Sequence, residues 1–230
     1  LAFEKMDLVV TVSENMRRHF INKYPETKVS FITLPIGFES LGNIRLMKKS
    51  SYNKPTIIYA GGLQKWQSIE LMKAVVDRTW QLYDYKFFVP DPEAFKSVWE
   101  ADAFPGIEVS TRLPQDLPSE YLNAHYGLLL REESVINKVS SPTKLTEYLA
   151  HGLIPVLNSA NVGDFVEEGM QYLKLDDLLN GRVPSEDKRY EMALKNLEVL
   201  KKFQALWEKN RLVLLAIQEQ FSIQLRKDPE

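Results

Sequence analysis

Residues whose types and spacing could support chemistry are concentrated in the stretch Ser140–Gly152, which reads Ser-Ser-Pro-Thr-Lys-Leu-Thr-Glu-Tyr-Leu-Ala-His-Gly. Ser141 suits a helix N-cap, Pro142 suits the first helical turn, and Gly152 suits the left-handed residue that closes a helix. We therefore predict a short helix here. It would lie immediately before the apolar, strand-like segment Ile154–Asn158.

Lys144 would occupy the third position of this helix, where a capping box would place Glu or Gln. A cation at the positive end of a helix is unfavourable by about 0.3–1 kcal/mol. A bound anion would remove this mismatch, because the free backbone N–H groups and the ammonium would hold it together. The alternative is that Lys144 extends into solvent. Nearby hydroxyl and basic side chains could add to an anion site: Ser140, Ser141, Thr143, Arg131 and Lys138.

Glu147 follows Lys144 by three residues, so both side chains would project from one face of the predicted helix. Leu145 and Leu149 are four residues apart and would form its buried face. A carboxylate one turn beyond the ammonium could accept hydrogen bonds from the sugar hydroxyls of a nucleotide, as an acidic residue does in dinucleotide-binding folds. The alternative is a solvent-exposed glutamate in the middle of a helix.

A paired glycine follows another apolar run. The segment Thr56–Ala60 leads into Gly61 and Gly62, and Lys65 and Trp66 come soon after. Paired glycines let the backbone approach a ligand closely, although this is neither a G-x-G-x-x-G motif nor a Walker A loop. Lys65 would lie at the carboxyl end of a parallel sheet, where ligands bind in open α/β folds. The alternative is a tight turn with a surface lysine.

Several other chemistries find no support in the sequence. The 230 residues include no cysteine, which excludes disulfides, thiolate catalysis and Cys-ligated zinc and fits a reducing compartment. The three histidines share no metal-ligand spacing, and H-E-x-x-H and G-x-S-x-G are absent. A formal net charge of −2 argues against a dedicated nucleic-acid binder. No signal peptide is visible, and no apolar run approaches the roughly 18 residues that span a bilayer.

The elements that must position these residues follow an alternating pattern, which predicts βαβ units and an α/β fold with a Rossmann-like, doubly wound parallel sheet. The composition, 44% hydrophobic and 26% charged, is typical of a globular protein. The strand-like runs are Asp7–Val12, Lys28–Thr33, Thr56–Ala60, Tyr85–Val89, Ile107–Thr111, Tyr126–Leu130 and Ile154–Asn158. The helix-period stretches are Glu14–Asn22, Ser68–Leu82, Pro92–Ala101, Ser119–Ala124, Thr143–His151 and Gly163–Glu168.

Composition also suggests four parts. Residues 1–40 hold about two strands and one helix, too little for a doubly wound domain, and are interpreted as the remnant of an amino-terminal domain. Residues 41–54 are polar and lack a period, as in a linker. Residues 55–184 form the Rossmann-like domain and residues 185–230 a helical carboxyl-terminal segment. Because the chain begins with Leu1 and not Met, we expect a fragment or a processed product. One apolar stripe in the last part predicts a packing helix: Leu194, Leu197, Leu200, Phe203 and Trp207.

These residues together resemble a known family. The stretch Ser141–Val156 is similar to the "sPxKl-EYla-G-PVi" element of group 1 glycosyltransferases with the GT-B fold, many of which act in bacterial capsule, lipopolysaccharide and exopolysaccharide assembly. The chain resembles the carboxyl-terminal, donor-binding half of such an enzyme over nearly its whole length. Further segments that resemble the family are Asp7–Glu14, Ile32–Gly37, Ile58–Leu63, Tyr121–Leu128, Asn161–Asp164 and Phe203–Glu208.

The resemblance implies a nucleotide-diphosphate sugar as donor and a glycan or lipid-linked acceptor. Ser140–Lys144 would hold the diphosphate and Glu147 the ribose hydroxyls. The turn Arg112–Leu113 would offer backbone contacts to the base, and the glycine loop would face the phosphates. No cofactor or bound metal is implied, because the helix dipole and basic side chains stabilise the leaving diphosphate. The donor-binding residues implied are Gly61, Gly62, Lys65, Arg112, Leu113, Ser140, Ser141, Thr143, Lys144 and Glu147.

The resemblance further implies a retaining, hexosyltransferase-like enzyme of polysaccharide or glycoconjugate biosynthesis. We expect it in the cytoplasm, with contact to the inner face of the membrane left open, and we expect the isolated chain to be inactive because the cleft needs the amino-terminal domain.

Some positions depart from the family pattern. The first glutamate of the family's Glu-x7-Glu pair falls on Val139, for which Glu132 or Glu133 could substitute, and the arginine of "vGRl" falls on Gly62. His125 replaces the usual aspartate of "aDiGl". Two alternatives therefore stay open: a non-catalytic partner subunit with a degenerate sugar-nucleotide site, and a nucleotide-sugar epimerase, which would need acid/base carboxylates and a histidine in the cleft.

Overall fold

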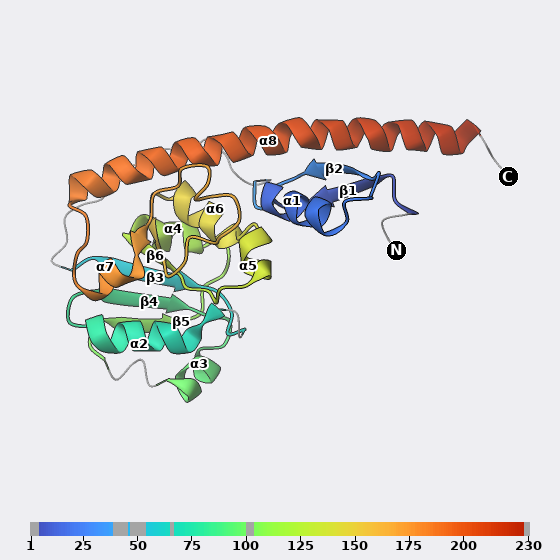
Figure 1. The fold of residues 1–230 in the computed structure, drawn as a ribbon. Coiled ribbons are helices and arrows are strands. Elements are labelled where there is room, and N and C mark those ends of the chain that lie inside the picture. Colours follow the sequence, from blue (N-terminus) through green and yellow to red (C-terminus); the bar gives the residue numbers. More distant parts are fainter. Residues whose placement is uncertain (1–4, 39–45, 47–53, 65–66, 100–103, 228–230) are drawn as a thin grey trace.

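The computed structural model describes residues 5–38, 46, 54–64, 67–99 and 104–227, with side chains to residue 220 except that of Val98. Two separate parallel sheets are formed (Figure 1). The smaller one pairs β1 (Leu8–Thr11) with β2 (Ser30–Thr33), and the connection between them contains α1 (Glu14–Lys23). Ser13 caps α1, because its side chain accepts a hydrogen bond from the backbone N–H of Met16.

The larger sheet confirms the predicted fold class. Its six strands are parallel and follow the order β5-β4-β3-β6-β7-β8. Numbered within this sheet alone, the order is 3-2-1-4-5-6, the doubly wound Rossmann arrangement, and the direction of winding reverses between β3 and β6. The strands are β3 (Thr56–Ala60), β4 (Asp84–Phe88), β5 (Ile107–Ser110), β6 (Tyr126–Leu129), β7 (Ile154–Leu157) and β8 (Leu173–Lys174).

Helices cover both faces of this sheet. Successive side chains of a strand point to opposite sides, so each strand contributes to a core on either face. Ile57 and Tyr59 of β3 belong to a core with α2, α3 and α7, whereas Ile58 and Ala60 belong to a core with α4 and α6. All four residues are buried, as a sheet with two covered faces requires. The helices are α2 (Ile69–Thr79), α3 (Pro92–Val98), α4 (Leu117–Leu122), α5 (Val135–Val139), α6 (Thr143–Ala150), α7 (Leu175–Leu179) and α8 (Glu186–Lys227).

The predicted carboxyl-terminal helices are one continuous helix, α8, which crosses α6 and continues past the β1–β2 sheet (Figure 1). Leu197, Leu200 and Phe203 pack against α6, which confirms the expected packing helix. Leu194 was expected in the same stripe but is 41% exposed, and the neighbouring Ala193 is buried in its place. Farther along α8, the Asn210 side chain donates a hydrogen bond to the Thr33 carbonyl of β2 at 2.6 Å.

The helix predicted over Gly163–Glu168 is wrong, since this segment forms hydrogen-bonded turns. Gly163 and Gly169 at its two ends have φ values of +64° and +101°, which interrupt a right-handed helix. The sequence pattern also missed α5, α7 and β8, which have five, five and two residues and are too short to show a period.

The helix expected after Ser140 is present as α6 but begins one residue late. Pro142 occupies the N-cap without a side-chain hydrogen bond, so Lys144 is the second helical residue and not the third. Gly152 follows the helix with φ +69°, as predicted. The domain boundaries stay a prediction, and the expected linker 41–54 lies outside the described residues except for positions 46 and 54.

Candidate functional site

The candidate site lies where the winding of the six-stranded sheet reverses. Gly61 and Gly62 follow β3, and Arg131 comes shortly after β6, so both segments end at the same edge of the sheet. The start of α6 brings Lys144 to this edge. Its Nζ atom lies 4.0 Å from the centroid of the Tyr59 ring and donates a hydrogen bond to Gln67 Oε1 at 3.3 Å. The sheet thus presents an ammonium at the crevice where open α/β folds bind ligands.

Gly61 leaves room for this ammonium. A Cβ atom at position 61 would lie 2.5 Å from Nζ of Lys144 and 3.1 Å from the Tyr59 hydroxyl. The Tyr59 hydroxyl in turn donates a hydrogen bond to the Gly62 carbonyl at 2.6 Å, which fixes the glycine loop over the ring. The position of Lys144 therefore depends on the absence of a side chain at residue 61.

We expect Gly61→Ala to weaken binding of inorganic pyrophosphate roughly three- to tenfold, because the new methyl group must displace the Lys144 ammonium and weaken a charge-assisted hydrogen bond. The fold should tolerate the change, since the clash is with the flexible end of a side chain. Calorimetric titration measures the affinity. An affinity of Gly61→Ala within twofold of that of the wild type would contradict the explanation.

Lys144 is a buried cation with an altered pKa. Its exposure is 9%, and burial lowers the pKa of its ammonium to about 7, with a further lowering by Arg131 and a partial offset by Glu147. Burial also lowers the pKa of Arg131, whose guanidinium nevertheless stays charged. Neither cation forms an ion pair with a carboxylate in the part of the chain that the structure describes.

Arg131 is held by neutral groups. Its backbone exchanges two hydrogen bonds with the Asn158 side chain, at 2.9 Å and 2.8 Å. Its guanidinium donates from Nη1 to Asn137 Oδ1 at 3.1 Å, whereas its buried Nε–H has no partner. Two neighbouring cations without an ion-paired carboxylate, one of them with an unsatisfied donor, are the arrangement that a bound anion of more than one charge would stabilise.

Glu147 is exposed on α6 and is oriented by a neighbouring phenol. The Tyr121 hydroxyl donates a hydrogen bond to Glu147 Oε2 at 2.8 Å. Tyr121 is 1% exposed, and burial, with the nearby Tyr148 and Glu147, raises its pKa strongly, so that it stays a protonated donor. The carboxylate therefore keeps a fixed direction and retains an oxygen for a ligand hydroxyl.

The hydroxyl residues around the start of α6 differ in their surroundings. Thr143 is exposed, whereas Ser141 is buried. The Ser140 hydroxyl donates to the Asn137 carbonyl at 3.0 Å, so it also supports the local backbone. Lys65, which was expected beside the glycine loop, lies outside the described residues.

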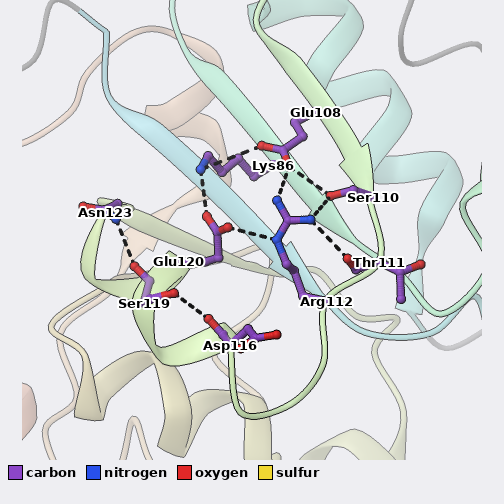
Figure 2. A network of polar contacts seen from close by, with 9 residues as sticks. All are labelled: Lys86, Glu108, Ser110, Thr111, Arg112, Asp116, Ser119, Glu120 and Asn123. Atoms are coloured by element: carbon purple, nitrogen blue, oxygen red, sulfur yellow. Dashed lines mark hydrogen bonds and ion pairs between the residues drawn. The ribbon is translucent and has the colours of Figure 1, made fainter.

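Arg112 follows β5 and belongs to a closed network of charges (Figure 2). Its guanidinium donates to Glu120 at 3.0 Å and to Glu108 at 2.7 Å, and Lys86 approaches the same two carboxylates at 2.8 Å and 3.8 Å. Arg112 also lies over the Phe88 ring at 4.8 Å. The Arg112 side chain is engaged in this network. The groups that remain available to a ligand at this edge of the sheet are the backbone of the turn at Arg112 and the side chain of Leu113, which is 57% exposed.

The positions that depart from the family pattern have structural partners. The Val139 carbonyl accepts a hydrogen bond from Ser13 Oγ at 2.6 Å, so this position contacts the start of α1. Glu133 accepts hydrogen bonds from Ser159 and Asn161, whereas Glu132 is exposed and its carboxylate has no partner among the described residues. His125 is buried, and its Nδ1 accepts the backbone N–H of Thr56 at 2.9 Å.

A cavity of about 440 Å³ opens farther along the same edge, at the ends of β7 and β8. Asn158, which binds the backbone of Arg131, forms part of its wall and so connects it to the two cations. Leu71, Leu157 and Leu175 provide apolar walls, and Lys174 and Asp176 provide charged ones.

Two features are absent from the described residues. No helix among them is long and apolar enough to cross a membrane. No three His, Asp or Glu side chains within the described ranges gather closely enough to hold a metal ion.

Sequence reasoning missed three side chains of the site: Tyr59, Tyr121 and Asn137. Tyr59 and Tyr121 are both buried, as core aromatic residues are. The available signal was that tyrosine, unlike phenylalanine, carries a hydroxyl that needs a partner when buried. Asn137 lies just before the Ser140–Gly152 stretch, but no pattern of residue types marked it as part of the site.

Comparison with known proteins indicates the fold. No protein-family model and no curated protein matches the sequence. Among solved structures, the chain is similar to an α,α-trehalose-phosphate synthase (UDP-forming) from Burkholderia vietnamiensis, with 13% identity and a TM-score of 0.59 over 94% of this chain and 61% of that one.

It is also similar to an E. coli structure reported as trehalose-6-phosphate with bound UDP-2-fluoro glucose (15% identity, TM-score 0.59, 88% of this chain and 59% of that one). A third is a variant of S. aureus TarM in complex with fondaparinux, α-GlcNAc-glycerol and UDP (12% identity, TM-score 0.52, 88% and 41%). These neighbours are GT-B glycosyltransferases, and the chain has the fold of one half of that architecture. It spans about 60% of the length of the trehalose-phosphate synthases it matches.

Proposed function

We propose that this chain is the donor-binding part of a group 1 glycosyltransferase that uses a nucleotide-diphosphate sugar. The observation that carries the proposal is the pair of cations, Lys144 and Arg131, at the reversal point of a Rossmann-type sheet, without a carboxylate partner in the described part of the chain. A diphosphate supplies the two or more negative charges that such a pair lacks.

The remaining groups suit the other parts of a nucleotide. Glu147, oriented by Tyr121, would accept hydrogen bonds from the ribose hydroxyls. The backbone of Arg112 and Leu113 would meet the base, roughly 10 Å along the edge from β3, since one strand separates β5 from β3 and neighbouring strands lie about 4.8 Å apart. Glycines 61 and 62 let the chain approach the phosphates closely.

In the transfer reaction, the sugar–phosphate bond breaks and negative charge grows on the departing diphosphate. Lys144, Arg131 and the backbone N–H groups at the start of α6 would stabilise this charge without reorganising, because burial and the contacts to Tyr59 and Asn137 hold the two cations in place. The sugar would pass to a glycan or lipid-linked acceptor in cytoplasmic polysaccharide or glycoconjugate synthesis with retention of anomeric configuration. The isolated chain would bind the nucleotide but not turn over.

Calorimetric titration of the purified chain with UDP, GDP and ADP tests this proposal. We expect one of the three to bind, and the corresponding monophosphate to bind at least roughly tenfold more weakly, because it loses a charge-assisted contact. No binding of any diphosphate, or equal binding of mono- and diphosphate, would contradict the proposal.

Glu147→Gln tests the ribose contact. We expect about a tenfold loss of affinity for the preferred diphosphate, the value of one hydrogen bond to a charged group. The same substitution should have a much smaller effect on the 2′-deoxy form, which lacks one hydroxyl to contact. Glu198→Gln, an exposed position on α8, serves as the control. An equal loss for the ribose and deoxyribose ligands would place Glu147 away from the 2′-hydroxyl.

A further inference from the structure

Helix α1 receives its first-turn hydrogen bonds from a distant part of the chain. The Asp164 carboxylate accepts the backbone N–H of Glu14 at 2.6 Å and that of Asn15 at 2.8 Å. The Asn15 side chain returns a hydrogen bond to the Gly163 carbonyl at 2.9 Å. These N–H groups are donors that a helix cannot satisfy internally. Asp164, which is 7% exposed, therefore docks α1 onto the larger sheet's domain.

The same turn also contacts the segment that leads into α6. Gly163 donates its backbone N–H to the Asn137 carbonyl at 3.3 Å. A Cβ atom at Gly163 would lie 2.1 Å from the Ser140 carbonyl oxygen, so only glycine fits here. Ser13, at the start of α1, donates to the Val139 carbonyl. The turn and α1 thus hold the short segment from Asn137 to Ser140 from two sides.

Asn137 joins this segment to the anion site. Its side chain is 3% exposed, accepts a hydrogen bond from Nη1 of Arg131 at 3.1 Å, and donates to the Glu132 carbonyl at 2.6 Å. A neutral amide fixes the guanidinium without cancelling its charge, whereas a carboxylate would form an ion pair and remove the attraction for an anion.

We propose that Asn137 and Asp164 are positioning residues of the anion site, and that docking of α1 and binding of a diphosphate favour each other through them. Asn137 aims the Arg131 guanidinium, and Asp164 keeps the Asn137 segment in place by anchoring α1 against it. This inference rests on the proposed function, since the ligand is a diphosphate. By linkage, the factor by which docking of α1 strengthens diphosphate binding equals the factor by which bound diphosphate strengthens the docking.

Substitutions at Asn137 test the first part of the proposal, that Asn137 aims the Arg131 guanidinium. Inorganic pyrophosphate is the probe, because its use does not require that the base of the nucleotide be known. We expect Asn137→Ala to weaken binding roughly fivefold by releasing the guanidinium, and Asn137→Asp to weaken it roughly 30-fold or more by pairing with it. A merely structural role would make the loss of affinity follow the loss of melting temperature. Affinities within twofold of the wild type in both variants would overturn this part.

Substitutions at Asp164 test the second part of the proposal, that docking of α1 and binding of a diphosphate favour each other. In the wild type, saturating pyrophosphate should slow amide hydrogen exchange at residues 14–17 of α1. Asp164→Ala should abolish this protection and weaken pyrophosphate binding about three- to fivefold, and Asp164→Asn, which keeps one acceptor oxygen, should have a smaller effect. Glu168→Gln, an exposed position in the same turn, is the control. Should Asp164→Ala fail to fold, Asn15→Ala removes the reciprocal hydrogen bond to Gly163.

The outcomes separate the two proposals. If the wild-type chain does not bind pyrophosphate or a nucleoside diphosphate, the proposed function fails. If it binds and the Asp164 and Asn15 variants bind equally well while α1 exchanges rapidly, docking and binding are independent and the inference of coupling is overturned.

Discussion

Replacement of Lys144 by methionine is expected to weaken diphosphate binding by one to two orders of magnitude and to raise the melting temperature at neutral pH. The ammonium is 9% exposed and forms no ion pair with a carboxylate in the described part of the chain, so its charge is compensated only in part, by Glu147, in the free protein. A bound diphosphate would complete that compensation. The residue therefore contributes to binding and opposes folding, and one substitution should move the two properties in opposite directions.

The expected sizes of the two effects of Lys144→Met, on affinity and on stability, follow from the buried position of the side chain. Loss of a buried charge-assisted contact to a phosphate costs about 2–3 kcal/mol, so affinity should fall roughly 30- to 150-fold for Lys144→Met and further when Arg131→Met is added. The unfolding free energy should rise by about 1–3 kcal/mol, less than the full desolvation penalty because the contact with the Tyr59 ring is lost. Calorimetric titration and differential scanning calorimetry measure the two effects.

Lys195→Met provides the matched control, because Lys195 is an exposed lysine on α8. It should leave both properties nearly unchanged. A Lys144→Met variant that binds diphosphate within threefold of the wild type, or that melts at a lower temperature, would show that Lys144 is a structural residue.

Diphosphate binding is expected to take up a proton between about pH 7 and pH 9. In the free protein the pKa of Lys144 is about 7, so its amine is largely neutral at pH 8. A bound anion favours the ammonium and raises this pKa. The terminal phosphate itself, with a second pKa of about 6, is already ionised. Affinity should therefore fall up to about tenfold per pH unit above 7.

Titration at pH 8 in buffers of different ionisation enthalpy measures the uptake. Lys144→Arg keeps a cation that does not titrate, so its binding should take up no proton and should be nearly independent of pH in this range. Proton uptake that persists unchanged in Lys144→Arg would assign it to another group.

The same group sets a pH dependence of stability. The folded pKa of Lys144 lies near 7 and the unfolded value is 10.5, so between these values the unfolded state binds more protons. Stability should therefore rise with pH from about 7 to about 10.5, by a total on the order of 5 kcal/mol, and stay level with respect to this group below pH 7. Lys144→Met should remove this rise.

The larger sheet was predictable because its strands are buried on both faces. Runs such as Thr56–Ala60 and Tyr126–Leu130 are almost continuously apolar, which distinguishes them from the helical stretches between them. The turns at 163–169 were mistaken for a helix because the pattern of apolar residues fits a helical period. The segment forms turns because Gly163 has a positive φ and because Asp164 accepts a hydrogen bond from α1, some 150 positions away in the chain.

The candidate site was predictable in part for a similar reason. Local spacing placed Lys144 and Glu147 on one face of a short helix and Gly61 at the end of a strand, but left open whether Lys144 extends into solvent. The answer depends on Tyr59, which lies 85 positions before Lys144 and supplies the ring beneath its ammonium. The roles of Tyr121 and Asn137 likewise arise from contacts between separate elements, which no local pattern encodes.

The length of α8 imposes a mechanical condition on the molecule. Its 42 residues correspond to a rod of about 63 Å. One part of this rod packs against α6 through Leu200 and Phe203, and a later part holds β2 through Asn210. Tilting the β1–β2 sheet away from the larger one would bend the rod and stretch the hydrogen bonds on its outer side, whereas rotation about the rod's own axis would leave them intact. The rod therefore opposes separation of the two sheets, and the hydrogen bonds of α1 to Asp164 and of Ser13 to the Val139 carbonyl oppose rotation about it.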